Sequence, residues 1–126
     1  MGGLSRKYVT VKQFYDKGKD PIILDAGDLL FSTPTLHDST RESEFYRATA
    51  VIEGFEKIGC DAINVGHYEL AAGLPLLLGL WKTTSIPFLS ANLRDVYTDE
   101  LLFDPYLMIR RGGITFGIIG LTDLVP

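Results

Sequence analysis

Residues 61–69 read DAINVGHYE, a short apolar run that ends in a glycine and is followed by three side chains able to take part in chemistry. Residues 22–28, IILDAGD, have the same arrangement, since their apolar run ends in a glycine and an aspartate. Near-continuous apolar runs are typical of strands covered on both faces, as in parallel sheets. Ligands of open α/β sheets bind at the carboxyl ends of such strands. We therefore expect Asp28 and residues 66–69 to form a candidate site.

The segments around these two runs alternate between helical and strand-like patterns. We predict a helix over 4–15, a strand over 22–26, a helix that contains 45–55 and ends at Gly59, a strand over 61–65, a helix over 74–81 and a strand over 87–92. Gly112 and Gly113 separate two further strand-like runs, 106–111 and 114–121, which is the signature of a β-hairpin. The predicted fold is therefore α/β, with a largely parallel sheet and a C-terminal β-hairpin.

The composition is that of one ordinary folded domain. The chain has 126 residues, of which 46% are hydrophobic and 22% charged, and this excludes disorder as its overall state. The net charge of -4 gives no basic surface for a phosphate backbone, so we expect no nucleic-acid partner. The apolar stretch 70–81 is shorter than the ~20 residues of a transmembrane helix, and the polar N-terminus has no signal-peptide pattern. The single cysteine does not indicate a compartment.

Taken singly, each candidate residue also has an ordinary structural explanation. Asp28 alone is compatible with an aspartate that accepts hydrogen bonds within a turn. His67 alone is compatible with a packed or solvated histidine, and His37 in the polar loop is expected to be solvated. Glu69 is expected to orient a loop by accepting hydrogen bonds from backbone amides. Asn92 is expected to hold the end of the third strand near the site.

Residues outside the candidate site are assigned structural roles. We predict that Asp25 is hydrogen-bonded within its strand end, that Cys60 is a packed small hydrophobe, and that Arg110 and Arg111 are solvated at a strand end. Five aromatic residues at helix or strand spacing are assigned to the core: Phe45, Tyr46, Phe55, Trp81 and Phe88.

Five segments together resemble a known family. Their sequences are GGLSR (2–6), LDAGD (24–28), DAINVGHYELAAG (61–73), SANL (90–93) and GIIGLT (117–122). They occur in the order seen in the 5′-nucleotidase and UDP-sugar hydrolase branch of the calcineurin-like metallophosphoesterases. The resemblance implies a four-layer α/β/β/α domain with two divalent metal ions, such as Zn²⁺ or Mn²⁺, that hydrolyses phosphate esters or anhydrides of nucleotides. Asp28 matches the carboxylate that bridges the two metals in that family.

The chain departs from the family in its second motif. The family reads Gly-Asn-His-Glu, an aromatic or apolar residue, and Asp, whereas this chain reads GHYELA at 66–71. His67 replaces the Asn ligand and remains able to bind a metal such as Zn²⁺. Tyr68 replaces the catalytic His, and its phenol can donate a hydrogen bond but cannot act as an imidazolium. Because a general acid contributes ~10²–10⁴ in rate, we expect little or no activity from this chain.

The resemblance also implies that the domain is incomplete. The Asp-x-His motif that opens the family's domain, and its later His ligands, have no match in residues 1–126, so we expect a single, N-terminal part of a metallophosphoesterase domain with an incomplete metal site. Exposed sheet edges then favour self-association. The family suggests a periplasmic or extracellular location.

Two other functions remain open from the sequence. The first is a non-catalytic binding or scaffolding module that keeps the fold without the chemistry. The second is an unrelated flavodoxin-like domain that binds a phosphate-bearing ligand at its strand ends, although no glycine-rich phosphate loop supports it.

Overall fold

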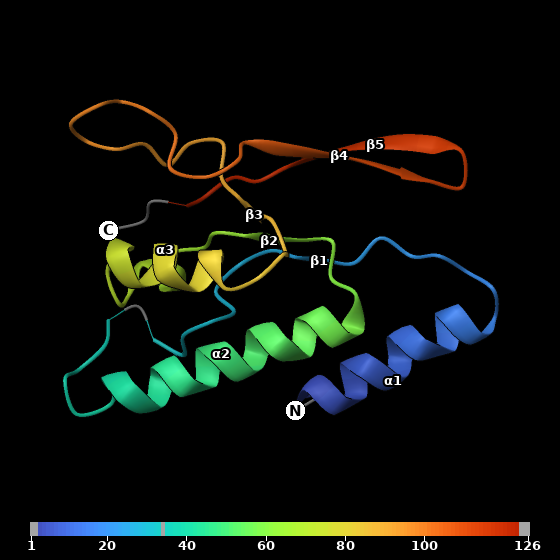
Figure 1. The fold of residues 1–126 in the computed structure, drawn as a ribbon, viewed down its shortest axis with the longest axis horizontal. Coiled ribbons are helices and arrows are strands. Elements are labelled where there is room, and N and C mark those ends of the chain that lie inside the picture. The colour runs from blue at the N-terminus through green and yellow to red at the C-terminus, as the bar shows by residue number, and fades with distance from the viewer. Residues whose placement is uncertain (1–2, 34, 124–126) are drawn as a thin grey trace.

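The computed structural model describes residues 3–33 and 35–123. Gly2, part of the first segment of the resemblance, lies outside them. Figure 1 shows the elements in chain order: α1 (Gly3–Asp16), β1 (Leu24–Asp25), α2 (Arg41–Ile58), β2 (Ala62–Asn64), the 3-10 helix η1 (Tyr68–Leu70), α3 (Leu74–Lys82), β3 (Phe88–Leu89), β4 (Tyr106–Arg111) and β5 (Ile114–Ile119). Each predicted helix and strand is therefore present; β4 has its predicted bounds, and the other strands are shorter than predicted.

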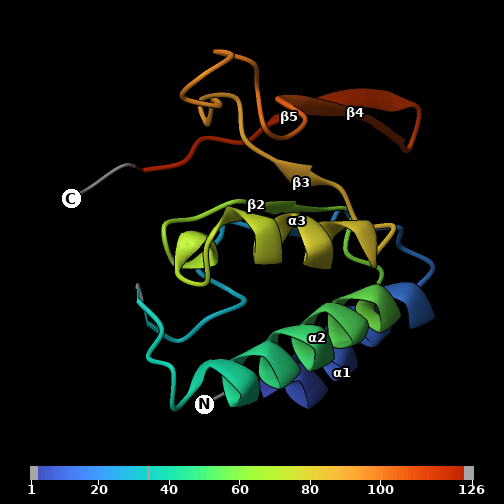
Figure 2. The same ribbon diagram turned by 60° about the vertical axis from the view of Figure 1, so that its left-hand side comes forward.

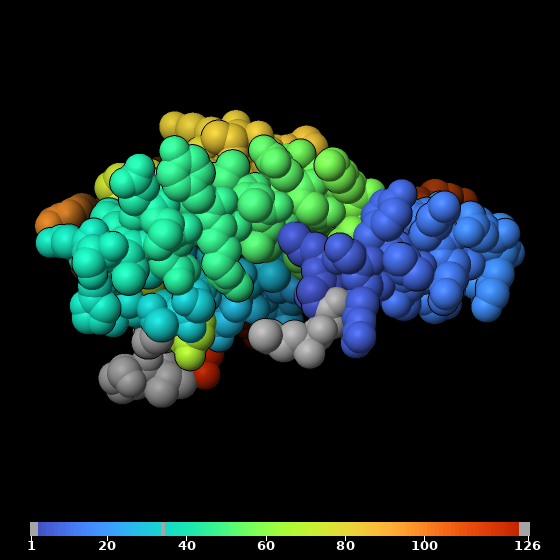
Figure 3. Space-filling view, turned by 90° about the horizontal axis from the view of Figure 1, so that it is seen from below, coloured from blue at the N-terminus to red at the C-terminus, as the bar shows by residue number. Residues whose placement is uncertain are grey.

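The first three strands form a parallel sheet in the order β1-β2-β3. Leu24 pairs with Ala62, and Ile63 pairs with Phe88, so β2 lies in the middle. Figures 1 and 2 show α1 and α2 on one side of this sheet and the β4–β5 hairpin on the opposite side. Figure 3, seen from below Figure 1, shows α1 and α2 side by side on the helical face. The α/β architecture and the parallel sheet are as predicted.

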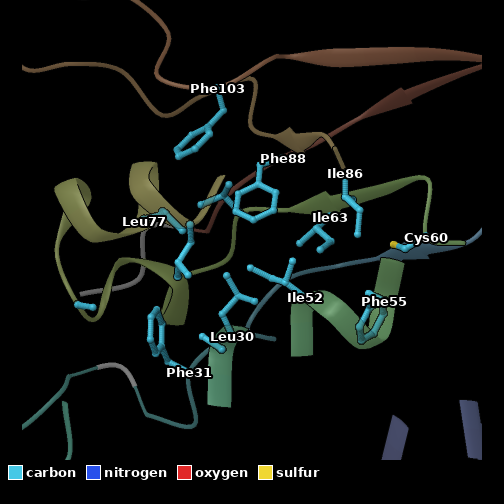
Figure 4. Close-up of a cluster of buried hydrophobic side chains, with 14 of the residues drawn as sticks. Leu30, Phe31, Ile52, Phe55, Cys60, Ile63, Leu77, Ile86, Phe88 and Phe103 are labelled. Carbon is cyan, nitrogen blue, oxygen red and sulfur yellow. The ribbon is translucent and has the colours of Figure 1, made fainter. Parts of the chain in front are cut away.

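The hydrophobic core lies between the parallel sheet and the helices. Ile63 and Phe88 of the sheet are completely buried, as is Leu77 of α3. Figure 4 shows these side chains converging with Ile52 and Leu30. Burial of a large aliphatic or aromatic side chain contributes about 1.5–3 kcal/mol, so this cluster accounts for much of the stability. It holds β2 in place, and the candidate site follows directly from the end of β2.

The two turn residues explain why β4 and β5 form a hairpin. Gly112 and Gly113 have φ angles of 57° and 77°, the left-handed region that a type I′ turn requires at both central positions. The six residue pairs of β4 and β5 run from Tyr106 opposite Ile119 to Arg111 opposite Ile114. Only Ile109 of these two strands is buried, so the hairpin exposes apolar side chains on both faces.

Three sequence predictions about burial are wrong. Leu24 is 47% exposed, because its side chain lines an open cavity beside β5 and β1 is therefore not covered on both faces. Phe45 and Tyr46 are also exposed, since Ala48, Ile52, Phe55 and Ile58 form the buried face of α2. The other aromatic residues of that set, Phe55, Trp81 and Phe88, do pack in or against the core.

The prediction that Arg111 is solvated at a strand end is also wrong. Its guanidinium forms an ion pair of 2.7 Å with Asp61 and a longer one of 3.4 Å with Asp20, whereas Arg110 is exposed as expected. The pair connects the end of β4 to the start of β2. Arg111 therefore holds the hairpin against the parallel sheet instead of being solvated.

Candidate active site

The candidate site is built where β1 and β2 end side by side. Their parallel register places Asp25 opposite Ile63, so the loops that follow the two strands leave the sheet together. The loops approach so closely that a Cβ atom on Gly27 would lie 2.9 Å from the Cα atom of Gly66. Gly27 also has a φ of 109°, which side chains rarely adopt. Both glycines are needed for this contact between the loops.

Asp28 connects the two loops through its side chain. Its Oδ1 atom accepts a hydrogen bond of 2.7 Å from the backbone N–H of Tyr68. The backbone of Asp28 is left-handed, with a φ of 54°, an uncommon conformation outside glycine. Asp25 accepts a bond of 2.9 Å from the N–H of Gly27, which confirms that Asp25 is hydrogen-bonded within the turn.

Glu69 connects the same two loops through its buried carboxylate. Its side chain is fully buried, and its two carboxylate oxygens accept hydrogen bonds from four backbone N–H groups. Their donors are Asp28 at 2.8 Å, Leu29 at 2.6 Å, Leu30 at 3.0 Å and Gly66 at 2.7 Å. The predicted role of Glu69, which was to orient a loop through backbone amides, is confirmed.

A cavity of about 310 Å³ lies over these loops. Its wall contains all three predicted site residues, Asp28, His67 and Tyr68, so the structure brings them together. The rings of His67 and Tyr68 are tilted relative to one another, with centroids 6.3 Å apart. His37 is exposed in its own loop, which confirms that it is solvated, and it is not part of this wall.

The cavity also contains two polar residues that the sequence did not single out, Asn64 and Asp123. Asn64 donates hydrogen bonds from Nδ2 to the carbonyl oxygens of Ala26, at 3.0 Å, and Leu121, at 2.7 Å. It thereby fixes the end of β1 and the segment after β5 to the end of β2. One weak sequence feature could have pointed to Asp123 as a site residue, namely its position just after the apolar run of β5.

Asn92 holds the segment that carries Asp123. Its side chain donates to the carbonyl oxygen of Thr122 at 2.7 Å and accepts from the N–H of the same residue at 2.8 Å. The hydroxyl of Thr122 donates in turn to the carbonyl oxygen of Val65 at 2.6 Å. The predicted role of Asn92, holding a strand end near the site, is confirmed.

The described residues do not form a complete metal site by themselves. Within residues 3–33 and 35–123, no group of three or more His, Cys, Asp or Glu side chains is placed to hold one. Asp28 and His67 share the cavity wall, but one oxygen of Asp28 is already engaged by Tyr68. A metal ion in this cavity would therefore need further ligands from other parts of the protein.

Cys60 lies away from the site, where the chain passes from α2 to β2. Burial raises the pKa of its thiol from the ordinary 9.0 to about 11. The prediction that Cys60 is a packed small hydrophobe is confirmed. Among the described helices, none has the length and apolar character needed to cross a membrane.

Comparison with solved structures establishes the fold class. The chain superposes on a calcineurin-like phosphoesterase from Bacillus subtilis with a TM-score of 0.69 at 20% identity, covering 92% of this chain and 39% of that one. A 5′-nucleotidase precursor from Thermus thermophilus gives a TM-score of 0.76 at 25% identity, covering 95% of this chain and 23% of that one. The fold is that of the calcineurin-like metallophosphoesterases.

Comparison with curated proteins shows which members of this fold class the chain is similar to. The chain is 35% identical over 112 residues to a 5′-nucleotidase of Vibrio parahaemolyticus. That match covers 88% of this chain and 20% of the relative, so the chain spans about one fifth of the length of the protein it matches. No protein-family model matches. The chain is thus similar, over most of its length, to one part of the 5′-nucleotidases, as the five segments predicted.

Proposed function

We propose that this chain contributes one wall of a phosphoesterase site that acts on phosphate esters or anhydrides of nucleotides. One observation supports this above the others. The loops after β1 and β2 meet at the carboxyl edge of the parallel sheet, joined by the 2.7 Å hydrogen bond between Tyr68 and Asp28. Two loops singled out for their chemistry thus share one cavity in a phosphoesterase fold.

Each residue of the wall has a proposed role. Asp28 offers its second carboxylate oxygen, and His67 its imidazole, as ligands for the two divalent ions that the resembling family uses. Zn²⁺ or Mn²⁺ suits this mixture of oxygen and nitrogen donors. Tyr68 offers a phenol that donates a hydrogen bond to a phosphate oxygen. The proposed metal site takes its remaining ligands from outside the described residues.

The proposal includes low activity for this chain. Tyr68 stands where the resembling family has its catalytic histidine, and a phenol does not supply the proton transfer of an imidazolium. Loss of a general acid lowers a rate by about 10²–10⁴-fold. Ala71 stands where the family has an aspartate, so a histidine placed at 68 would also lack a carboxylate to orient it.

The test is to restore the histidine. Release of phosphate from AMP, and of UMP and glucose 1-phosphate from UDP-glucose, is measured with added Mn²⁺ or Zn²⁺ for the full-length protein that contains this chain and for its Tyr68→His variant. We expect Tyr68→His to raise turnover, and Asp28→Ala in the same background to abolish the gain. Tyr97→His is the matched control, since Tyr97 is 93% exposed in a distant loop. A Tyr68→His variant with no gain would contradict the enzymatic proposal.

A second candidate function is a non-catalytic module that binds nucleotides. Tyr68 itself favours it, because the phenol keeps a hydrogen-bond donor in the cavity while removing the imidazole. This module binds AMP in calorimetry, loses that binding on Asp28→Ala or Tyr68→Phe, and gains no turnover from Tyr68→His. The two functions are therefore separated by the same set of variants.

We further propose that residues 1–126 are part of a larger domain and that, as an isolated chain, they self-associate. The accessible surface is 8057 Å². A compact monomer of 14.0 kDa exposes about 6,700 Å². The difference, about 1,400 Å², exceeds the ~800 Å² that each partner buries in a standard interface. For the parent protein, we propose the periplasmic or extracellular location of the resembling family.

A further inference from the structure

The buried carboxylate of Glu69 is bonded to both loops of the candidate site. Oε1 accepts from the N–H groups of Leu29 and Leu30, and Oε2 accepts from those of Asp28 and Gly66. Asp28, Leu29 and Leu30 lie 39 to 41 residues away in sequence, whereas Gly66 lies only three residues away. One side chain thus gathers amides from the two segments that form the wall of the cavity.

This arrangement satisfies a group that is otherwise costly to bury. An ionised carboxylate removed from water destabilises the fold by several kcal/mol unless it is paired or hydrogen-bonded. Within the described chain, the partners of Glu69 are backbone N–H groups, and hydrogen bonds to a charged acceptor are about twice as strong as neutral ones. Because the four bonds share the same two oxygens, we expect the network to open as a unit.

The same network accounts for the unusual backbone of Asp28. Its φ of 54° costs of order 1–3 kcal/mol and persists only where the surroundings impose it. Here the N–H of Asp28 points to Glu69 at 2.8 Å, while its side chain accepts from Tyr68 at 2.7 Å. The position of the Asp28 carboxylate therefore depends on a backbone conformation that Glu69 maintains.

We infer that Glu69 is a positioning residue that locks residues 28–30 to residues 66–68 before any ligand binds. It aims the Asp28 carboxylate by holding the backbone of Asp28, so that one carboxylate oxygen receives the N–H of Tyr68 and the other has no hydrogen-bond donor among residues 3–33 and 35–123. The inference rests on the proposed function only in treating this cavity as the active site. The locked geometry itself is a property of the ligand-free chain.

Amide hydrogen exchange of the ligand-free chain tests the inference. In Glu69→Gln, an amide NH₂ replaces one of the two acceptor oxygens and faces N–H groups. We expect the amides of residues 28–30 and 66 to exchange about ten- to a hundredfold faster. The amide of Tyr68 accelerates too, although Glu69 does not accept from it. The amides of Ile63 and Val65, bonded at 3.0 Å to the carbonyl oxygens of Pro87 and Leu89, report that the sheet remains folded.

Two further variants show whether the effect runs from Glu69 through Asp28 to the amide of Tyr68. Asp28→Ala removes the acceptor of the Tyr68 amide, so only that amide accelerates, while residues 29, 30 and 66 keep their protection. Glu56→Gln is the matched control, because Glu56 is exposed on α2 and accepts from the hydroxyl of Thr84, outside both loops, so its loss leaves all five site amides unchanged. If the Tyr68 amide stays protected in Glu69→Gln, Glu69 is only a local support and the inference is wrong.

The wild-type chain alone also decides the question if Glu69→Gln does not fold. The amides of residues 28–30, 66 and 68 then have to exchange with one common opening equilibrium, as a cooperative unit does. Separate equilibria for residues 28–30 and for residues 66–68 would overturn the inference. No substrate or metal is added, so a failure of the proposed phosphoesterase activity leaves these outcomes unaffected.

Discussion

The backbone N–H of Tyr68 donates a hydrogen bond of 2.7 Å to the Oδ1 atom of Asp28, which lies 40 residues earlier in the chain. This bond joins the two loops that carry the candidate site. Each loop helps to position the other, so the two motifs together indicate a site although neither does so alone. The geometry of the site therefore depends on a small number of close contacts, and each of them can be changed by substitution.

Replacing Gly66 by alanine should damage the site and the fold. The added Cβ atom would lie 2.5 Å from the Asp28 nitrogen, 2.6 Å from its Oδ1 atom and 2.8 Å from Oε2 of Glu69. Two of these atoms cannot move without breaking the hydrogen bonds of Glu69. We expect Gly66→Ala to lower the free energy of unfolding by about 1–3 kcal/mol in urea denaturation.

Gly79 provides the matched control, since it lies within α3 and a Cβ atom added there would meet open space. Gly79→Ala should raise the free energy of unfolding by about 0.5–1 kcal/mol, because alanine loses less backbone entropy than glycine in a helix. Equal effects of the two substitutions would contradict the close contact at Gly66.

Replacing Arg111 by methionine should loosen the hairpin. The guanidinium pairs with Asp61 at 2.7 Å, and the other carboxylate oxygen of Asp61 accepts from the N–H of Ile23 at 2.9 Å. Both charged side chains are largely screened from water, at 27% and 16% exposure. We expect Arg111→Met to cost about 1–3 kcal/mol in the free energy of unfolding.

Arg110→Met is the control for that experiment, because Arg110 is exposed at the preceding position. Surface substitutions of this kind usually change stability by less than about 0.5 kcal/mol. The amides of β4 and β5 should also exchange faster in Arg111→Met than in Arg110→Met. A similar stability for the two variants would show that the ion pair contributes little.

Local signals predicted much of the fold. The Gly112–Gly113 turn defines a hairpin through its own backbone preferences, and Gly59 ends α2 in the left-handed conformation that its position predicted. These features depend on neighbouring residues only. The exposure of Leu24 could not be predicted in this way, because an apolar run does not reveal whether other elements cover both faces of its strand.

The candidate site shows the same division. Asp28, His67 and Glu69 were found because each follows an apolar run and a glycine. Asn64 was missed, although it binds the carbonyl oxygen of Leu121, 57 residues later in the chain. Asp123 was missed for a related reason, since its place in the cavity depends on how the segment after β5 docks on the parallel sheet. Such long-range contacts leave no local pattern.

Cys60 should react slowly with thiol reagents in the folded chain. Its pKa is raised from 9.0 to about 11, with burial as the main cause. At about pH 8 the reactive thiolate is then roughly a hundredfold less abundant than in an ordinary cysteine. We expect labelling to accelerate about tenfold per pH unit until about pH 11, and the urea-unfolded chain to label at the ordinary rate.

The same shift has a consequence for stability. Because the folded pKa of Cys60 lies above the unfolded one, its contribution is complete below about pH 9 and is lost as the pH rises through about 11. Cys60→Ala should lack this loss, so the stability difference between wild type and variant shrinks over that window. A labelling rate that levels off near pH 9 would contradict the raised pKa.

The isolated chain should self-associate through the hairpin. β5 (Ile114–Ile119, ITFGII) has no charged residue and no proline, and it is an edge strand of the described hairpin, which is the pattern of a strand that pairs with another copy. Ile114 and Ile119 are 59% and 68% exposed at its two ends. In an antiparallel pair of β5 strands, one end of each strand lies beside the opposite end of its partner. We therefore expect sedimentation to show concentration-dependent dimers of the wild-type chain.

A lysine at either end of β5 should weaken that dimer, because burying a charge at a strand–strand contact is unfavourable. We expect Ile114→Lys and Ile119→Lys to raise the dimer dissociation constant by at least about tenfold, equivalent to about 1.4 kcal/mol. Tyr97→Lys is the matched control, since that side chain is 93% exposed in a loop outside the hairpin. Equal weakening by all three lysines would indicate a general effect of charge rather than pairing through β5, and a wild-type chain that stays monomeric at every concentration would exclude this contact.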